Sequence, residues 1–301
     1  MRFRRVRADA ELVYEVEGPD GQWEPRPDWE PLGPSPFTSA FERENADEYP
    51  GGRCLPFQPL SFRDFMLHEQ HVIDAGHGML RQFHPGLHRL ATTFERTTGR
   101  TFPPLKPKPL WYREPIYYMS NHVTFVPSGT PMAFPRYSKA LDFELELGFV
   151  LGRELRDATP DAAADAIAAF VVLNDFSARD VQRPEMESGF GPQASKHFAN
   201  SLSETAVTAD EILPKINALT GSVAINGRTI ATVKSEGMRY TLGEVVAHVS
   251  RSQTLRAGEL FGTGTLPGGS GMEIGYWLQP GDRLTLTIDG IGEIEHEITG
   301  S

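Results

Sequence analysis

Apolar and polar positions alternate with a period of two through much of the chain after about residue 123. In LDFELELGFVLG (residues 141–152), Phe143, Leu145, Leu147 and Phe149 occupy every second position, and the final residues are apolar on both faces. This pattern predicts a strand that is buried first on one face and then on both. Related patterns predict strands at 123–134 and 171–177, and hairpins at 222–235, around Asn226-Gly227, and at 281–298.

Helical periodicity is confined to a few segments. We expect helices at residues 61–83, 84–99, 159–170 and 240–255. Ser61 is the expected N-cap of the first helix, and Thr159, followed by Pro160, is the expected N-cap of the third. The proline-rich segment between residues 103 and 118 cannot form a regular helix. The pattern as a whole predicts an α+β, β-rich mixed fold with few helices.

Residues 1–60 differ from the rest of the chain. RFRRVR at residues 2–7 predicts an edge strand with solvated arginines, and a GPDG turn accompanies a second short strand. From residue 24 to about residue 59 the chain is rich in proline, glycine and acidic residues. This predicts an irregular ordered arm or, in part, a lid. We therefore divide the chain into an N-terminal β/irregular arm, residues 1–60, and a main domain, residues 61–301.

Charge and cysteine content narrow the functional classes. The net charge is −11, and the one basic cluster is at residues 2–7, so we expect no nucleic-acid partner. The single cysteine, Cys54, excludes an internal disulfide and fits a reducing compartment. No segment approaches the about 20 apolar residues that a membrane span needs, and no signal-peptide pattern is present. We therefore expect a cytoplasmic protein with no membrane partner.

Acidic residues occupy the polar face of the strand at 141–152. Asp142, Glu144 and Glu146 alternate there, with neighbours ~6.6 Å apart, so they repel one another unless the face is solvated or binds a cation. A solvated face is the ordinary explanation. The apolar run that follows favours a cation, and so does Asp175 at the end of another apolar strand. Oxygen ligands without thiolate favour Mg²⁺, Ca²⁺ or Mn²⁺ over zinc.

Two further segments extend this acidic pattern. Glu144-Leu145-Glu146 is followed by NDFSARDVQ at residues 174–182 and then by Lys196. The combination closely resembles the fumarylacetoacetate hydrolase (FAH) family, in which a Glu-x-Glu strand precedes Asn-Asp-x-Ser-Ala-Arg-Asp-x-Gln and a lysine. The resemblance covers about residues 61–301. It implies the fold of that family's C-terminal domain, with rolled mixed β-sheets and few helices, for an FAH-like catalytic domain.

The resemblance also assigns roles to matching positions. Asp64 and His71 have the family's seven-residue spacing between a metal ligand and a catalytic base, and on the expected helix they would share a face. HEQH at residues 68–71 is not an HExxH zinc motif, because its histidines are i, i+3. The implied metal ligands are Asp64, Glu144, Glu146 and Asp175. The implied catalytic residues are His71, Glu273, Arg179, Gln182 and Lys196.

The resemblance also implies roles for residues whose neighbours in the sequence match the family less closely. Tyr118 and Thr265 match substrate-binding positions, and Glu273 is implied to pair with His71. The family has a substrate-binding tyrosine two residues after the metal aspartate, where this chain has Met66. Methionine cannot donate a hydrogen bond to a substrate carboxylate, which argues against fumarylacetoacetate as the substrate. Asp142 has no implied role, and we expect it at the solvated end of its strand.

The implied activity is that of a divalent-metal-dependent hydrolase or lyase acting on a small anionic 2-oxo acid or β-dicarbonyl compound. Mg²⁺ or Ca²⁺, with Mn²⁺ as another option, would chelate the substrate and stabilise an enolate as a C–C bond breaks. His71 would activate water, while Arg179, Gln182 and Lys196 would donate to the oxyanion. Family members are usually homodimers, and we expect the same here.

Other activities use the same scaffold. The alternatives are a dehydratase of 2-oxo-3-deoxy sugar acids and an oxaloacetate or acylpyruvate decarboxylase-hydrolase. A non-catalytic metal-binding protein is a third alternative. Such a protein would need no general base, so the intact set with His71 and Glu273 argues against it.

Overall fold

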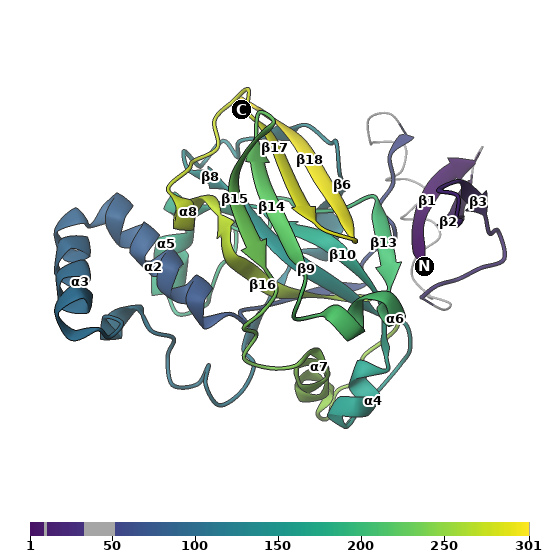
Figure 1. The fold of residues 1–301 in the computed structure, drawn as a ribbon, viewed down its shortest axis with the longest axis horizontal. Coiled ribbons are helices and arrows are strands. Elements are labelled where there is room, and N and C mark those ends of the chain that lie inside the picture. The colour runs from purple at the N-terminus through teal and green to yellow at the C-terminus, as the bar shows by residue number, and fades with distance from the viewer. Residues whose placement is uncertain (9–10, 33–51, 301) are drawn as a thin grey trace.

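The strands form two sheets and a short strand pair, in a computed structural model that describes residues 1–8, 11–32 and 52–300 (Figure 1). The larger sheet has the order β3-β2-β1-β13-β10-β9-β16-β4-β5, and β12 and β6 extend from β10. Its strands are β1 (Arg2–Ala8), β2 (Glu11–Glu17), β3 (Trp23–Pro25), β4 (Ser61–Phe65), β5 (Tyr117–Ser120), β6 (Phe125–Pro127), β9 (Glu144–Leu151), β10 (Ile167–Asp175), β12 (Asn200–Leu202), β13 (Thr205–Thr208) and β16 (Glu259–Ser270).

The smaller sheet has five strands in the order β15-β14-β17-β18-β7. They are β7 (Met132–Ala133), β14 (Thr220–Ile225), β15 (Arg228–Lys234), β17 (Arg283–Ile288) and β18 (Gly292–Thr299). The strand pair is β8 (Leu141–Asp142) with β11 (Ser177–Ala178). Helices in the described residues are α2 (Glu69–Phe83), α3 (Pro85–Thr98), α4 (Pro160–Ala164), α5 (Arg179–Glu187), α6 (Ala209–Ile212), α7 (Leu242–Ser250) and α8 (Gly271–Ile274). The predicted fold class is confirmed.

The main hydrophobic core lies between the two sheets. Leu145, Leu147 and Phe149 of β9 belong to one buried cluster with residues of the smaller sheet such as Leu286 and Ile294. In Figure 1, the smaller sheet (green and yellow) lies across β9 and β10. Helices α2 and α3 lie at one end of the molecule and strands β1–β3 at the other. No helix among the described residues has both the length and the apolar character of a membrane span.

The opposite face of β9 explains its change in composition. Val150 on that face belongs to a second buried cluster, with Phe62 of β4 and Val171 of β10. Every residue of β9 is buried. The strand is therefore apolar on both faces where it runs between two cores, and it carries Glu144 and Glu146 where the second core ends.

The predicted helix at residues 61–83 is wrong in its first third. Residues 61–65 form β4, which pairs in parallel with β16 and antiparallel with β5. Helix α2 begins only at Glu69, and Ser61 is not its N-cap. A strand that is buried on both faces shows no clean alternation, so its apolar residues read equally well as part of the helix that follows. Asp64 and His71 therefore lie on different elements and not on one helix face.

The N-terminal strands also differ from the prediction. Strand β1 lies between β2 and β13, so it is not an edge strand. Arg5 is buried and donates to the carbonyl oxygen of Leu55, while Arg4 pairs with Glu15 at 2.8 Å. The GPDG turn joins β2 to a third strand, β3. Residues 33–51 of the predicted arm lie outside the described residues, and the division at residue 60 stays a prediction.

Most local signals gave the expected elements. The hairpin at Asn226-Gly227 joins β14 to β15 with both residues at positive φ, as a type I′ turn requires. Thr159 caps α4 by accepting from the backbone N–H of Ala162. That helix ends at Ala164, earlier than predicted, because β10 already begins at Ile167.

Candidate active site

Three carboxylates from three strands lie close together where the second core ends. One oxygen each from Asp64 (β4), Glu146 (β9) and Asp175 (β10) lies within 4.8 Å of the others, and all three side chains are buried. Gly262 of β16 lies between β4 and β9. A Cβ atom there would stand 2.6 Å from Asp64 Oδ1 and 2.7 Å from Glu146 Oε2. The glycine therefore leaves the space in which these carboxylates approach one another.

The donor set fits a divalent cation. Burial, and then the charges of neighbouring carboxylates, raise the pKa values of Asp64 and Glu146 well above their ordinary range. Asp64 Oδ1 is buried without a hydrogen-bond partner. A hard cation among the three oxygens would satisfy that atom and offset the repulsion. The structure thus brings together three of the four predicted metal ligands.

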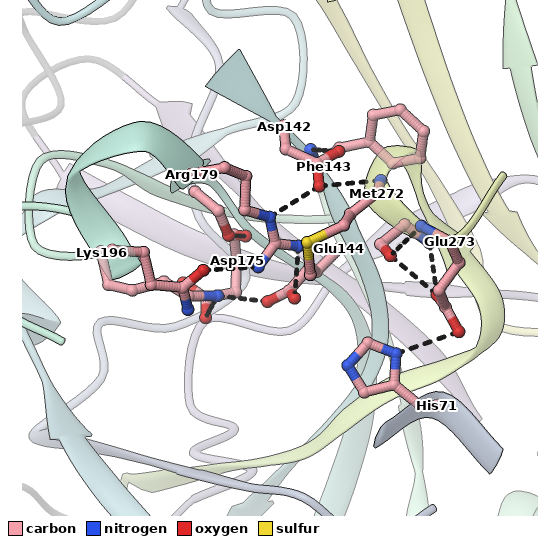
Figure 2. A network of polar contacts seen from close by, with 12 residues as sticks. His71, Asp142, Phe143, Glu144, Asp175, Arg179, Lys196, Met272 and Glu273 are labelled. Carbon is pink, nitrogen blue, oxygen red and sulfur yellow. Dashed lines mark hydrogen bonds and ion pairs between the residues drawn. The ribbon is translucent and has the colours of Figure 1, made fainter. Parts of the chain in front are cut away.

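Glu144, the fourth predicted ligand, faces two cationic side chains instead. Its Oε1 accepts from Arg179 Nη2 at 2.7 Å, and its Oε2 accepts from Lys196 Nζ (Figure 2). Lys196 also donates to Asp175 Oδ2 at 2.5 Å, which joins this pair to the acidic triad. Burial alone would raise the pKa of Glu144, but Arg179 and Lys196 hold it well below the usual range. Its role as a metal ligand stays a prediction.

The structure contradicts the prediction that Asp142 lies at a solvated end of its strand. Its side chain is fully buried and accepts from Arg179 Nε at 2.7 Å. Arg179 also donates from Nη1 to Gln182 Oε1 at 2.8 Å, so the predicted donors Arg179 and Gln182 lie together. Asp142 shares the face of Glu144 and Glu146, and it is buried because β8 pairs with β11 directly before Arg179. In the sequence, the signal for Asp142 was its alternation with Glu144 and Glu146 along the strand.

Asp175 has two further partners at the triad. Tyr118 on β5 donates its hydroxyl to Asp175 Oδ2 at 2.5 Å, which places the predicted substrate-binding tyrosine beside the carboxylates. Burial, and then the charge of Asp175, raise the pKa of Tyr118 well above its usual value, so it stays a neutral donor. Asn200 on β12, with its amide oriented to give the nitrogen an acceptor, donates to Asp175 Oδ1 at 2.7 Å. No pattern in the sequence had singled out Asn200.

The predicted pairing of His71 with Glu273 is present in the structure. Their Nδ1 and Oε1 atoms lie 3.1 Å apart, and both side chains are buried. The Glu273 carboxylate is fixed by the backbone N–H and the hydroxyl of Ser270 and by the N–H of Gly268. Burial opposes protonation of His71, but the charge of Glu273 and the contact with it outweigh this effect and raise the pKa of the imidazole.

Helices α2 and α8 hold this pair together. A Cβ atom at Gly78 of α2 would stand 2.0 Å from the carbonyl oxygen of Met272 in α8. The absence of a side chain at Gly78 thus lets the helix that carries His71 approach the backbone next to Glu273.

Two predicted substrate-binding residues remain, Thr265 and Met66. Thr265 pairs with Glu146 across β16 and β9 and is buried. Met66 follows β4 and is 38% exposed, and its carbonyl oxygen accepts from Trp111 Nε1 at 2.5 Å. Both positions are compatible with substrate contact, which stays a prediction for each.

The fold and the acidic site together define the class, a metal-dependent enzyme. The sequence profile of the fumarylacetoacetate hydrolase C-terminal domain matches residues 97–299, so the chain belongs to the fumarylacetoacetate hydrolase family. The mitochondrial oxaloacetate tautomerase FAHD1 of Rattus norvegicus is 31% identical over 189 residues, which cover 62% of this chain and 82% of that protein. Oxaloacetate tautomerase YcgM of Escherichia coli is 31% identical over 178 residues, 59% of this chain and 78% of that protein.

Solved structures show the same fold at lower identity. The fumarylacetoacetate hydrolase of Exiguobacterium antarcticum superposes with a TM-score of 0.67 over the whole of both chains, at 20% identity. Fumarylpyruvate hydrolase from Pseudomonas aeruginosa, in complex with Mn²⁺ and pyruvate, has a TM-score of 0.59 at 19% identity and covers 82% of this chain and 98% of that chain. The family and fold inferred from the acidic motifs are thereby confirmed.

Proposed function

We propose that this chain is a divalent-metal-dependent enzyme that cleaves a C–C bond in a small 2-oxo acid or β-dicarbonyl compound. The observation that carries the proposal is the buried His71–Glu273 pair, 3.1 Å apart. The charge of Glu144 acts on His71, and Lys196 joins Glu144 to Asp175 of the acidic triad. A metal-binding protein without catalysis needs the triad but not the base. Asp64, Glu146 and Asp175, with Glu144 as a fourth candidate, would hold Mg²⁺, Mn²⁺ or Ca²⁺. The bound ion would supply Lewis-acid polarisation of the substrate carbonyl.

His71 is the proposed base. In its neutral form it accepts a proton from water, and the carboxylate of Glu273 stabilises the imidazolium that results. The hydroxide attacks the carbonyl carbon. As the C–C bond breaks, its electron pair moves into the 2-oxo acid fragment, and His71 returns a proton to the carbon that was released. His71 therefore both removes the proton from water and delivers it to the released carbon.

The proposed oxyanion donors are Gln182, Arg179 and Lys196. Gln182 accepts from Arg179 through Oε1, and its Nε2 donates to none of the described residues, so this amide group remains available as a donor. Burial would lower the pKa of Lys196, but the charges of Asp175 and Glu144 outweigh this effect and raise the pKa above its usual value. The lysine therefore stays charged and donates hydrogen bonds.

A substrate panel tests the proposal. Purified protein is assayed with acylpyruvates, oxaloacetate, a 2-oxo-3-deoxy sugar acid and β-diketones, with Mg²⁺ or Mn²⁺ and with a chelator. We expect metal-dependent loss of the acylpyruvate absorbance, reduced about 10²- to 10⁴-fold in His71→Gln. His77→Gln on the same helix is the matched control, because His77 pairs with Glu95 away from the triad. Full activity in His71→Gln would contradict the proposal.

Tautomerisation of a 2-oxo acid is a second candidate, favoured by the 31% identity to the oxaloacetate tautomerases. It uses the same base but no attacking water. Turnover in D₂O separates the two reactions: C3 deuterium exchange without a cleavage product indicates the tautomerase, and two carboxylic products indicate C–C cleavage. The predicted homodimer is tested separately by light scattering.

A further inference from the structure

Asp142 lies between the two halves of the candidate site. One half holds Arg179, which donates to Glu144 and Gln182, and the other half holds the His71–Glu273 pair (Figure 2). Asp142 is fully buried, and each of its oxygens has a partner. Oδ1 accepts from its neighbour, the backbone N–H of Phe143, at 2.8 Å. Oδ2 faces both halves of the site.

The Oδ2 atom joins segments that are far apart in the sequence. It accepts from Arg179 Nε at 2.7 Å and from the backbone N–H of Met272 at 3.1 Å. Met272 belongs to α8 and directly precedes Glu273. A single carboxylate oxygen thus connects the guanidinium to the backbone that carries the orienting glutamate.

The backbone of α8 is closely packed on both sides. A Cβ atom at Gly271 would stand 2.3 Å from Asp142 Oδ1, and one at Gly78 of α2 would stand 2.0 Å from Met272 O. Helix α8 therefore has the Asp142 carboxylate on one side and the helix of His71 on the other. If α8 shifts from Asp142 while α2 stays in place, Glu273 moves relative to His71.

We infer that Asp142 is a positioning residue that fixes the distance between Arg179 and the His71–Glu273 pair. It does so by holding Arg179 and α8 on one oxygen. The contribution of Asp142 to catalysis rests on the proposed function, in which Arg179 donates to the substrate oxygens and His71 activates the attacking water. Catalysis depends on such distances, because small misplacements of reacting groups lower rates strongly. Neither the family motif nor the local sequence assigns this role to Asp142.

Two substitutions of Asp142 distinguish the loss of its positioning contacts from the loss of its charge. Asp142→Asn removes the negative charge but keeps a carbonyl oxygen that can accept from both Arg179 Nε and Met272 N–H. Asp142→Ala removes the charge and both contacts. Glu259→Gln is the control for loss of a buried charged pair. Glu259 pairs with buried Arg63 and accepts from Ser61 and from the backbone N–H of Arg256, none of which is a candidate site residue.

The first measurement is the titration of His71 by NMR in metal-free protein, with its signal assigned through His71→Gln. We expect Asp142→Ala to shift the His71 titration to lower pH, because α8 is no longer fixed and the Glu273 carboxylate loses its position against the imidazole. Asp142→Asn and Glu259→Gln should leave the titration near that of the wild type. An unchanged titration in Asp142→Ala overturns the inference. An equal shift in Asp142→Asn and Asp142→Ala also overturns it, since that result reports direct charge loss.

The second measurement is steady-state kinetics of the metal-loaded enzyme. We expect kcat to fall at least about tenfold in Asp142→Ala with little change in KM, and to recover in Asp142→Asn. If Asp142→Ala does not fold, Asp142→Leu at similar volume replaces it in both measurements. Absence of turnover by the wild type on every substrate contradicts the proposed function, whereas the NMR titration, which needs no substrate, tests the positioning of His71 independently.

Discussion

The Nδ1 atom of His71 lies 3.1 Å from Oε1 of Glu273, although the two residues are 202 positions apart in the chain. Helix α2 supplies the histidine, and the short helix α8 supplies the glutamate. The contact has chemical consequences because both side chains are buried, where the carboxylate charge acts on the imidazole with little screening.

Glu273→Gln should change the pH dependence of the reaction. The glutamate raises the pKa of His71, and the histidine acts as a base only when neutral, so activity should increase as the pH rises through that pKa. Without the carboxylate charge the pKa falls. The acid limb of the kcat/KM profile should then move to lower pH, while the plateau decreases about 10- to 100-fold because the ring is less well oriented. An acid limb at the wild-type pH would contradict the role of Glu273.

Glu146→Gln should abolish stabilisation by divalent cations. A cation that binds only the folded state raises stability by mass action, by about 2.7 kcal/mol at a concentration one hundred times Kd. We expect Mn²⁺ or Mg²⁺ to raise the Tm of the wild type and of Glu259→Gln but not of Glu146→Gln. In metal-free protein the variant should be at least as stable as the wild type, because one of the mutually repelling carboxylates is gone. A full Tm shift in Glu146→Gln would exclude this carboxylate as a ligand.

Gly262→Ala should disrupt the triad from the backbone side. The added methyl group would stand 2.6 Å and 2.7 Å from carboxylate oxygens of Asp64 and Glu146, so those oxygens must move apart. We expect cation affinity, measured by calorimetry, to fall at least about tenfold, with a loss of about 1–3 kcal/mol in the free energy of unfolding. Gly86→Ala is the control, because a Cβ atom there has no neighbour within 4 Å. Wild-type affinity in Gly262→Ala would show that the oxygens can separate without loss of the cation.

His296 should make the fold sensitive to acid. Burial lowers its pKa to about 4, compared with about 6.5 in the unfolded chain, and Nδ1 contacts the carbonyl oxygen of Thr130 at 2.7 Å. The folded state therefore binds fewer protons than the unfolded state between these values, and its stability falls as the pH decreases from about 6.5 to about 4. The loss from this residue should reach about 3 kcal/mol. Urea unfolding at several pH values, compared with His296→Gln, measures it; parallel profiles for the two proteins would refute it.

Local sequence signals located most elements but not all of them. The Asn226-Gly227 hairpin and the Thr159 cap depend on neighbouring residues, and the sequence was sufficient for both. Strand β4 was misread as helix because both its faces are buried, with Phe62 in the second core and Phe65 in the main core, against residues that are distant in sequence. Strand β1 was misread as an edge for the same reason, since its partner β13 lies about 200 residues later.

The sequence by itself determined which chemical groups the site contains. The Glu-x-Glu alternation and Asp175 at the end of an apolar strand indicated a hard-cation site, and the resemblance to the family added Lys196 as a catalytic residue. Only the tertiary structure decided how these groups divide: Asp64, Glu146 and Asp175 meet, while Glu144 faces Arg179 and Lys196. It also decided that Asp142 is buried and joins Arg179 to α8. The physical reason is that alternation along one strand fixes the face of a side chain, whereas its partners and its burial depend on strands and helices that pack there from elsewhere in the chain.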